Sequence, residues 1–285
     1  MFNVATEADG QVETDAPGDG LGGVQAVPRN PWRIQKSVVF ALFIRELKSR
    51  FGAYKGGYVW LLVEPMAHVL LLGLIFSALR HRGSSGIDTP VLIVTGVVPF
   101  LMFKNIALQV MEGVDANRAL FTFRQIKPTD VFVARTLLDG FLSLAVFAIL
   151  LVGMAWLGMA TPFRDPLAVL FILGLLIAAA LGLGMIFCVV VRYMPESKTF
   201  IRLSFMPLYL LSGIVFPLAA VPQAYLSWLM WNPLVHAIEA LRDGFFLHYP
   251  LIPGVSPGFA AMTGIGLLLV GLAWYRTQRY ELLAQ

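Results

Sequence analysis

Charged side chains are scarce in this sequence. Only 13% of its 285 residues are Asp, Glu, Lys or Arg, whereas a soluble domain has about 25%. Hydrophobic residues make up 58% of the chain. The composition therefore predicts a membrane protein, and the net charge of +4 means little until the charges are assigned to the two sides of the bilayer.

The motifs of common chemical sites are also missing. Cys188 is the only cysteine and lies in an apolar run, so it forms no intrachain disulfide and is expected to pack. There is no phosphate-binding loop, no dinucleotide fingerprint and no H-E-x-x-H motif. The four histidines have no ligand spacing. We therefore predict no metal, no cofactor and no catalytic residues in this chain, and no means of hydrolysing ATP.

Residues 1–28 lack the basic start and apolar core of a signal peptide. They are rich in Gly, Ala and acidic residues, which predicts a disordered cytoplasmic tail, with a regulatory role as the alternative.

Six segments are long and apolar enough to cross a bilayer, which takes roughly 20 residues. They are about 58–79, 91–111, 131–157, 167–191, 200–217 and 257–275, and the fifth is short and contains Pro207. The predicted fold is an all-α membrane protein with one transmembrane domain over residues 57–285.

Lys and Arg residues are distributed unequally between the two sides. One side has Arg29, Arg33, Lys36, Arg45, Lys48, Arg50, Lys55, Arg118, Arg124, Lys127, Arg135, Arg192, Lys198, Arg202, Arg276 and Arg279. The other side has Arg80, Arg82, Arg164 and Arg242. The positive-inside rule then predicts that both termini are cytoplasmic, as an even number of spans requires.

Residues 29–56 predict an amphipathic helix in the headgroup plane. The face formed by Phe40, Phe43, Ile44, Leu47 and Phe51 is apolar, and Arg45, Lys48 and Ser49 lie opposite. A cytoplasmic helix docked on a partner is the alternative.

The loop 112–130 is cytoplasmic by the same charge pattern, and Ala116–Ile126 predicts a short helix within it. Large apolar groups rimmed by cations favour a docking surface for a partner. Packing against the chain's own membrane face is the alternative.

The segment 218–256 on the outer side predicts two short helices, about 222–230 and 233–247, in a re-entrant hairpin over 218–250. Tyr225, Trp228, Trp231 and Tyr249 would lie at headgroup level.

The stretch WNPLVHAIEALRDGFF gathers His236, Glu239, Arg242 and Asp243, which raises the question of a catalytic cluster. A helical wheel instead predicts the wet polar face of a short helix, capped by Asn232, with Glu239 paired to Arg242.

Polar residues within the predicted spans are costly and often functional. Glu64 and His68 share one helix face, which favours a polar path or a subunit contact. Lys104 either extends to the interface or lines a water-filled path. The aromatics in spans 1, 2 and 5 either stack on sugar rings or pack. They are Trp60, Phe100, Phe103, Phe205, Tyr209 and Phe216.

Taken together, these pieces resemble the ABC-2 type transporter permeases. Five stretches narrow the resemblance to capsular-polysaccharide export permeases: RELKSRFGAYKGGYVWLLVEPMAHVLLL, LIVTGVVPFLMF, ANRALFTFRQIKPTDVFVAR, LSGIVFPLAAVPQAYLSWLMWNPLVHAIEALRDGFF and GLAWYRTQ. They occur in order between about residues 32 and 280. The N-terminal tail has no counterpart.

The resemblance implies a homodimer in the bacterial inner membrane with two ATP-binding cassette subunits, which hold ATP and Mg. The expected cargo is a lipid-linked acidic polysaccharide that passes through a canal between the two copies, bordered by spans 1, 2 and 5. A periplasmic or inner-membrane adaptor and an outer-membrane exporter would continue the path, and no nucleic acid is expected.

The resemblance also suggests roles for residues. The canal would be lined by Trp60, Glu64, His68, Phe103, Lys104, Arg202, Phe205 and Tyr209, with the aromatics stacking on sugars and Lys104 and Arg202 contacting anionic groups. Coupling to the ATPase would use Ala116, Asn117, Arg118, Leu120, Phe121, Phe123 and Arg124. The polar face of helix 233–247, with Trp231, would rim the exit.

Three alternatives stay open at this stage. The cargo is another glycan or lipid, such as O-antigen or teichoic acid; or the chain is a membrane-embedded glycan transferase, whose acids and bases should gather at one interface; or it is a structural anchor, which leaves Glu64, His68 and Lys104 without a use.

Overall fold

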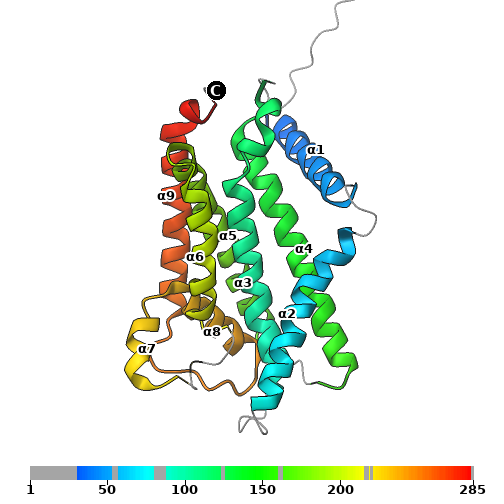
Figure 1. The fold of residues 1–285 in the computed structure, drawn as a ribbon, viewed down its shortest axis with the longest axis vertical. Helices are drawn as coiled ribbons and strands as arrows, with labels where there is room; N and C mark the ends of the chain where they lie inside the picture. Colours follow the sequence, from blue (N-terminus) through cyan, green and yellow to red (C-terminus); the bar gives the residue numbers. More distant parts are fainter. Residues whose placement is uncertain are drawn as a thin grey trace, which may run out of the picture.

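The computed structural model describes residues 31–52, 57–79, 88–122, 126–159, 163–214, 218 and 221–283, and all regular elements within them are helical (Figure 1). This confirms the all-α class. The predicted tail 1–28 lies outside the described residues, as do Phe123 and Arg124 and the side chain of Trp60.

Four long apolar helices run along the long axis of the molecule (Figure 1). They are α3 (Thr89–Met111), α4 (Pro128–Trp156), α5 (Pro166–Tyr193) and α9 (Pro257–Leu283). Each is long and apolar enough to cross a membrane. Four of the six expected spans are thereby found. α2 (Gly57–Leu79) contains Pro65, and α6 (Ser197–Leu210) has only 14 residues.

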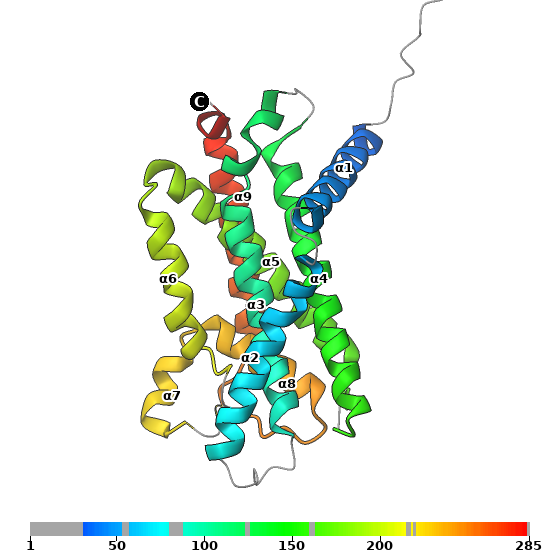
Figure 2. The same cartoon turned by 45° about the vertical axis from the view of Figure 1, so that its right-hand side comes forward.

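The bundle has two distinct ends. At the first, the η1 end, lie η1 (Asp115–Thr122), the start of α4 and the end of α9, and α1 (Pro31–Gly52) crosses α4 obliquely (Figures 1 and 2). The opposite end, the α8 end, holds α7 (Gln223–Leu229) and α8 (Pro233–Phe245). The short helices expected at 222–230 and 233–247 are confirmed as helices.

Proline marks the start of many of these helices. Pro31, Pro90, Pro128, Pro166, Pro233 and Pro257 all occupy first or second helical positions. Proline is favoured there because the first amides of a helix have no intrahelical acceptor, so the missing N–H costs nothing. Asp165 caps α5, since its side chain accepts from the amides of Leu167 and Ala168 at 3.1 Å each.

The fifth expected span, 200–217, is wrong at its far end because α6 stops at Leu210. Gly213 then adopts a φ of +65°, which favours glycine. The carbonyls of Gly213 and Ile214 are not in helix bonds but accept from Arg242. A side chain from another segment thus replaces the helix ladder at this point.

α3 is buried along almost its whole length and forms the centre of the core, with α4 and α5 packed against it. Glycines permit the closest helix crossings. A Cβ at Gly182 of α5 would lie 2.4 Å from the amide nitrogen of Leu268 on α9, and one at Gly271 would lie 2.4 Å from the carbonyl of Gly182. α5 and α9 therefore pack backbone against backbone.

We expect Gly182→Ala to destabilise the protein by about 1–3 kcal/mol, because the added methyl group meets backbone atoms that cannot move aside. Gly174→Ala on the same helix meets open space. It should be neutral or stabilising, since Ala is the better helix former. Thermal unfolding in detergent distinguishes the two, and equal melting temperatures would show that the crossing is loose.

Candidate functional site

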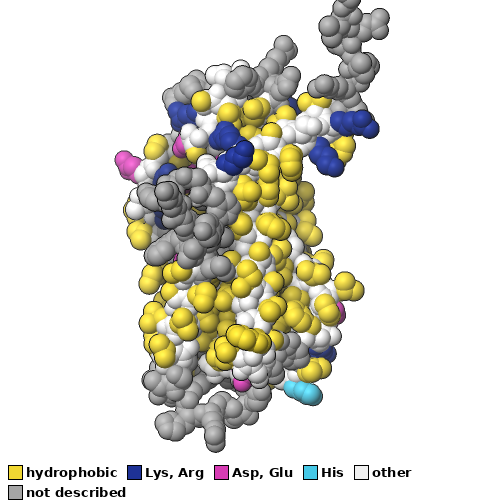
Figure 3. All heavy atoms as spheres, turned by 90° about the vertical axis from the view of Figure 1, so that its right-hand side faces the viewer, with side chains coloured by type: hydrophobic (Ala, Val, Ile, Leu, Met, Phe, Trp, Pro, Cys, Tyr) yellow, Lys and Arg dark blue, Asp and Glu magenta, His cyan; other side chains and the backbone are white. Residues whose placement is uncertain are grey.

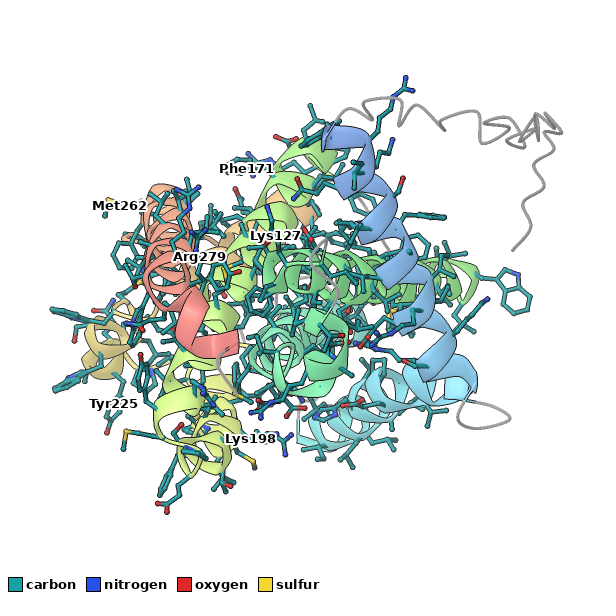
Figure 4. The ribbon with its side chains drawn as sticks, turned by 90° about the horizontal axis from the view of Figure 1, so that it is seen from above. Lys127, Phe171, Lys198, Tyr225, Met262 and Arg279 are labelled. Atoms are coloured by element: carbon teal, nitrogen blue, oxygen red, sulfur yellow. The ribbon has the colours of Figure 1, made fainter. Side chains whose placement is uncertain are left out.

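α2 and α6 lie at the same edge of the bundle, on either side of α3 (Figures 2 and 4). The three helices α2, α3 and α6 correspond to the first, second and fifth expected spans. Both flanking helices carry large exposed apolar side chains. They are Leu70, Leu71 and Leu74 on α2 and Phe200, Leu203 and Met206 on α6. This edge is the part of the structure that gathers most of the expected canal residues.

An aromatic cluster joins α2, α3 and α6 at this edge. The ring of Tyr209 meets His68 at 5.9 Å and Phe100 at 5.3 Å between centroids, both edge to face. Phe205 makes the same kind of contact with Phe103 and with Phe187, at 6.3 Å each. The structure therefore brings together residues that are distant in the sequence.

Two of these aromatics do not present a free ring to a sugar. Phe103 and Phe205 are each only 3% exposed and cover one another. In this conformation they pack against each other, which was the stated alternative to stacking on sugar rings. Tyr209 is half-buried, and its hydroxyl has no hydrogen-bond partner among the described residues. A buried hydroxyl without a partner is costly, so Tyr209 is the better candidate for a polar ligand contact.

The two expected cationic contacts differ from one another. Arg202 forms an ion pair with Glu112, and Lys198 lies 3.3 Å from the same carboxylate. Arg202 is thus already engaged with a carboxylate, which it shares with Lys198. Lys104 is half-buried on α3 and makes no hydrogen bond or ion pair within the described part of the chain. Of the two, Lys104 is therefore the one available to an anionic group.

Glu64 lies in a polar pocket of about 270 Å³ between α2, α3 and α4. Asn105, Gln109, Asp139 and Ser143 also line it. Glu64 and His68 therefore meet different neighbours, although they are one helical turn apart: His68 contacts α6, whereas Glu64 faces the side of α4.

A network of polar contacts joins α1, η1 and α4. Arg45 donates to Oδ1 of Asn117, whose amide group donates to the carbonyl of Gly113 at 2.9 Å. Arg50 pairs with Asp139 of α4. Glu46 pairs at 3.0 Å with Arg135, which also donates at 2.7 Å to the carbonyl of Gln109 on α3. The network thus ties the loop segment to three helices.

These contacts refine the expectation for α1. Arg45 is exposed, as expected opposite the apolar face, and its guanidinium also reaches η1. The apolar contact of α1 with α4 is made by Leu42 against Val131 and Ala134. Of the expected apolar face, Phe40 is exposed, whereas Phe43, Ile44 and Leu47 are only half-buried. α1 therefore docks on the protein through a mixed face.

The η1 segment confirms a short helical loop near the expected place, though its side chains divide into two groups. Leu120 and Phe121 pack against the apolar cluster that contains Leu42, so the packing alternative holds for them. Asn117 is buried. Ala116 and Arg118 are exposed, and Arg118 pairs with the equally exposed Asp115 at 3.0 Å.

α8 is buried on all sides, between α3, α5 and α9. Its N-terminus forms as predicted: Asn232 accepts from the amide of Leu234 at 3.0 Å. Glu239 and Arg242 also pair as predicted, at 3.1 Å. Both, however, are 0% exposed. The expectation of a wet polar face is therefore wrong.

Internal partners replace water around Arg242. Its guanidinium donates to the carbonyls of Gly213 and Ile214 at 2.7 Å each, and to that of Leu92 on α3 at 3.4 Å. Gly96 makes the space, since a Cβ there would lie 2.7 Å from the guanidinium. Arg242 thus links α8, the end of α6 and the start of α3.

Glu239 and His236 also have internal partners, although Oε2 of Glu239, like Nε of Arg242, is buried with no hydrogen-bond partner among the described residues. Tyr249 donates to Oε1 of Glu239 at 3.0 Å, and burial raises the pKa of the Tyr249 hydroxyl, so it remains a donor. The amide of Ser256 donates to Nδ1 of His236 at 3.0 Å. Its Nε2 therefore carries the proton toward the carbonyl of Met230, 2.8 Å away. All three side chains are thus buried and held by internal contacts.

Three outer aromatic residues remain at the surface. Tyr225, Trp228 and Trp231 are 63%, 80% and 85% exposed, whereas Tyr249 is buried and cannot reach the headgroups as expected. Asp243 pairs with Arg164 at 2.8 Å across a partly exposed contact.

The profile of the ABC-2 type transporter family matches residues 37–246, which is most of the chain. The chain belongs to the ABC-2 type transporter family.

The names of several relatives of this ABC-2 protein refer to the export of polysaccharides. The polysialic acid transport protein KpsM of Escherichia coli is 37% identical over 90% of this chain and 98% of its own. The capsule polysaccharide export inner-membrane protein CtrC of Neisseria meningitidis is 29% identical over 84% of this chain and 90% of its own. The O-antigen export system permease RfbA of Klebsiella pneumoniae is 21% identical over 83% and 90%.

Sequence reasoning missed two site residues of this ABC-2 protein. Asp139 and Gly96 were not singled out, although one is central to the α1 network and the other seats Arg242. A signal existed for Asp139: Arg135 and Asp139 are charges four residues apart inside a predicted span, where charges are costly unless paired. Gly96 carried no signal, because the group that needs its space comes from a distant segment.

We expect Arg242→Met to destabilise the ABC-2 protein by about 3–5 kcal/mol, because it leaves Glu239 charged and buried and removes the donor to three carbonyls. Arg164→Met is the matched control, since its pair with Asp243 is partly exposed and should contribute less than about 1 kcal/mol. Thermal unfolding of the purified protein measures both. Equal shifts would mean that α8 is not anchored through Arg242.

Proposed function

We propose that the chain is the permease subunit of an ATP-driven exporter that moves lipid-linked capsular polysaccharide across the inner membrane. The similarity to KpsM, at 37% identity over 90% of this chain, carries the proposal. The lower identity to the O-antigen permease, 21%, favours a capsule polymer over O-antigen as cargo. KpsM is named for an acidic polymer, so an acidic cargo is proposed here.

In this proposal the chain crosses the membrane six times, with α2 and α6 as the two shorter crossings. The 14 residues of α6 span about 21 Å, less than the roughly 30 Å of a hydrocarbon core. The irregular segment after Leu210 would complete the crossing. Irregular backbone at membrane depth is tolerated where protein covers it, as Arg242 does for Gly213 and Ile214.

The η1 end would face the cytoplasm. Lys127, Lys198 and Arg279 lie at this end, seen from above in Figure 4. The positive-inside rule then makes both termini cytoplasmic. The α7–α8 hairpin would re-enter the outer leaflet with Trp228 and Trp231 at the headgroups. An adaptor and an outer-membrane exporter would meet the α8 end.

Two copies would enclose the canal with their α2–α3–α6 edges. The exposed leucines of α2 and the exposed apolar side chains of α6 supply apolar contact area for a second copy. Within such a canal, Lys104 is a cation and Tyr209 a hydroxyl that have no partner among the described residues. Lys104 suits an acidic polymer better than a neutral one, and Tyr209 can hydrogen-bond to a sugar of either kind. Trp60 stays a candidate for stacking.

Two ATP-binding subunits with ATP and Mg would dock on the exposed part of η1, around Ala116 and Arg118. Movement of η1 would reach the membrane helices through Asn117, because Arg45 ties that residue to α1. The ion pairs of Arg50 and Arg135 then tie α1 to α4. The coupling element in this proposal is the whole α1–η1–α4 assembly.

Deletion of the gene tests the function. Polymer retained in the cytoplasm, visible by antibody labelling of permeabilised cells, supports export. Absence of polymer altogether would instead favour a transferase and overturn the proposal. Co-purification of an ATP-binding subunit with the full-length chain supplies the second criterion.

For coupling, we expect Asn117→Ala and Arg45→Ala each to lower export roughly tenfold, the effect of losing about 1.4 kcal/mol of coupling. ATP hydrolysis by the isolated partner subunit should not change. The double variant should be no worse than either single one, because one contact is lost in all three. Lys48→Ala, at an exposed position of the same helix, is the control. Additive losses would contradict a shared contact.

For the canal, Lys104→Gln should lower export of an acidic polymer by roughly tenfold, whereas Lys104→Arg should retain most of it because the positive charge is kept. Surface polymer per cell is the measurement. If Lys104→Gln and Lys104→Arg give the same amount of surface polymer, the charge of Lys104 has no part in transport.

A further inference from the structure

A groove of about 640 Å³ lies between α1 and α4, on the side of the bundle away from α6 and α9 (Figure 4). Trp32, Lys36 and Phe40 line it from α1, and Val133, Leu137 and Phe141 line it from α4. Most of these large apolar side chains are more than half exposed. The groove belongs neither to the proposed canal edge nor to the exposed part of η1.

The groove has the depth of one membrane leaflet. It begins at Thr129, in the first turn of α4, and continues to Phe141 along one face of that helix. Twelve residues of helix rise about 18 Å. One leaflet of a hydrocarbon core is roughly 15 Å deep. An acyl chain lying along α4 would therefore fit its length, with its polar end at the η1 end.

Charge at the mouth of the groove selects the polar end of the ligand. Asp130 lines the groove but is engaged: it accepts from Nε2 of Gln35 at 3.2 Å and from the amide of Lys127 at 3.0 Å. Lys36 is exposed and makes no hydrogen bond or ion pair within the described residues. The unpaired charge on the groove wall is thus positive.

The surface around the groove has the same polarity. Figure 3 shows this side of the molecule, with Lys and Arg side chains gathered at the η1 end above a largely hydrophobic surface. Cations at headgroup level above an apolar surface attract anionic lipids.

We propose that the groove binds one phospholipid with an anionic headgroup, its acyl chain between α1 and α4 and its phosphate on Lys36. Because α1 carries Arg45 and Arg50, the bound lipid would hold the helix that connects η1 to α4. This site is independent of the cargo, since it involves none of the residues of the proposed canal.

Native mass spectrometry of the full-length protein, titrated with palmitoyl-oleoyl phosphatidylglycerol or the matching phosphatidylcholine, tests the site. Lys36→Gln should weaken phosphatidylglycerol binding about fivefold, the fold-change for about 1 kcal/mol from one Lys near a surface, and weaken phosphatidylcholine binding less, because the choline cation already compensates the charge of its phosphate. Val133→Trp fills the groove and should abolish the specific binding of both lipids.

Controls sit on the same two helices outside the groove. Lys48→Gln and Val152→Trp occupy exposed positions of α1 and α4 and should bind both lipids as the wild type does. Melting temperatures identify any variant that fails to fold. If Lys36→Gln weakens both lipids equally, or Val133→Trp weakens neither, the proposal is overturned.

Two other occupants are also distinguished. If Leu137→Cys forms a cross-link between two copies, the groove is assigned to a second copy and the lipid site is overturned. A co-purified glycolipid that phosphatidylglycerol does not displace, and that Val133→Trp loses, would assign the groove to a lipid-linked sugar, with the same consequence.

Discussion

A fully buried guanidinium organises the α8 end of this protein. Arg242 is surrounded by apolar helices, so it must find acceptors inside the protein, and it finds them on the carbonyls of Gly213 and Ile214, which follow the end of α6, and on that of Leu92 in the first turn of α3. Three features depend on the guanidinium of Arg242: the end of α6, the position of α8 and the glycine at position 96. Removing water from a charge makes its geometry demanding, because each lost hydrogen bond costs its full desolvation penalty.

At the η1 end, buried charges are compensated by ion pairs. Charges from α1 and α4 meet in pairs that are mostly buried, and Arg45 of α1, which is in neither pair, donates to Asn117 of η1. Between these two polar ends the bundle is almost entirely apolar and closely packed. A displacement applied to η1 is therefore passed to whole helices rather than absorbed by side chains, since packed interiors deform little.

The helices of this chain were predictable because spanning a bilayer is a local requirement on length and composition. The environment of α8 was not. An amphipathic pattern is the same whether its polar face meets water or meets carbonyls from elsewhere, and the partners of Arg242 lie 28 and 150 positions away. The residues predicted for the canal show the same limit: the pattern selected Phe103 and Phe205 as aromatics of two expected spans, but only packing shows that they cover each other.

The glycine crossing of α5 and α9 has a consequence for motion. Two backbones in direct contact cannot slide without a clash, so α5 and α9 must behave as one rigid body. α6, by contrast, meets its neighbours through aromatic edges, which tolerate small sliding movements. Any widening of the edge that holds Tyr209 should therefore come from shear of α6 across α3, with the α5–α9 pair as the fixed reference frame.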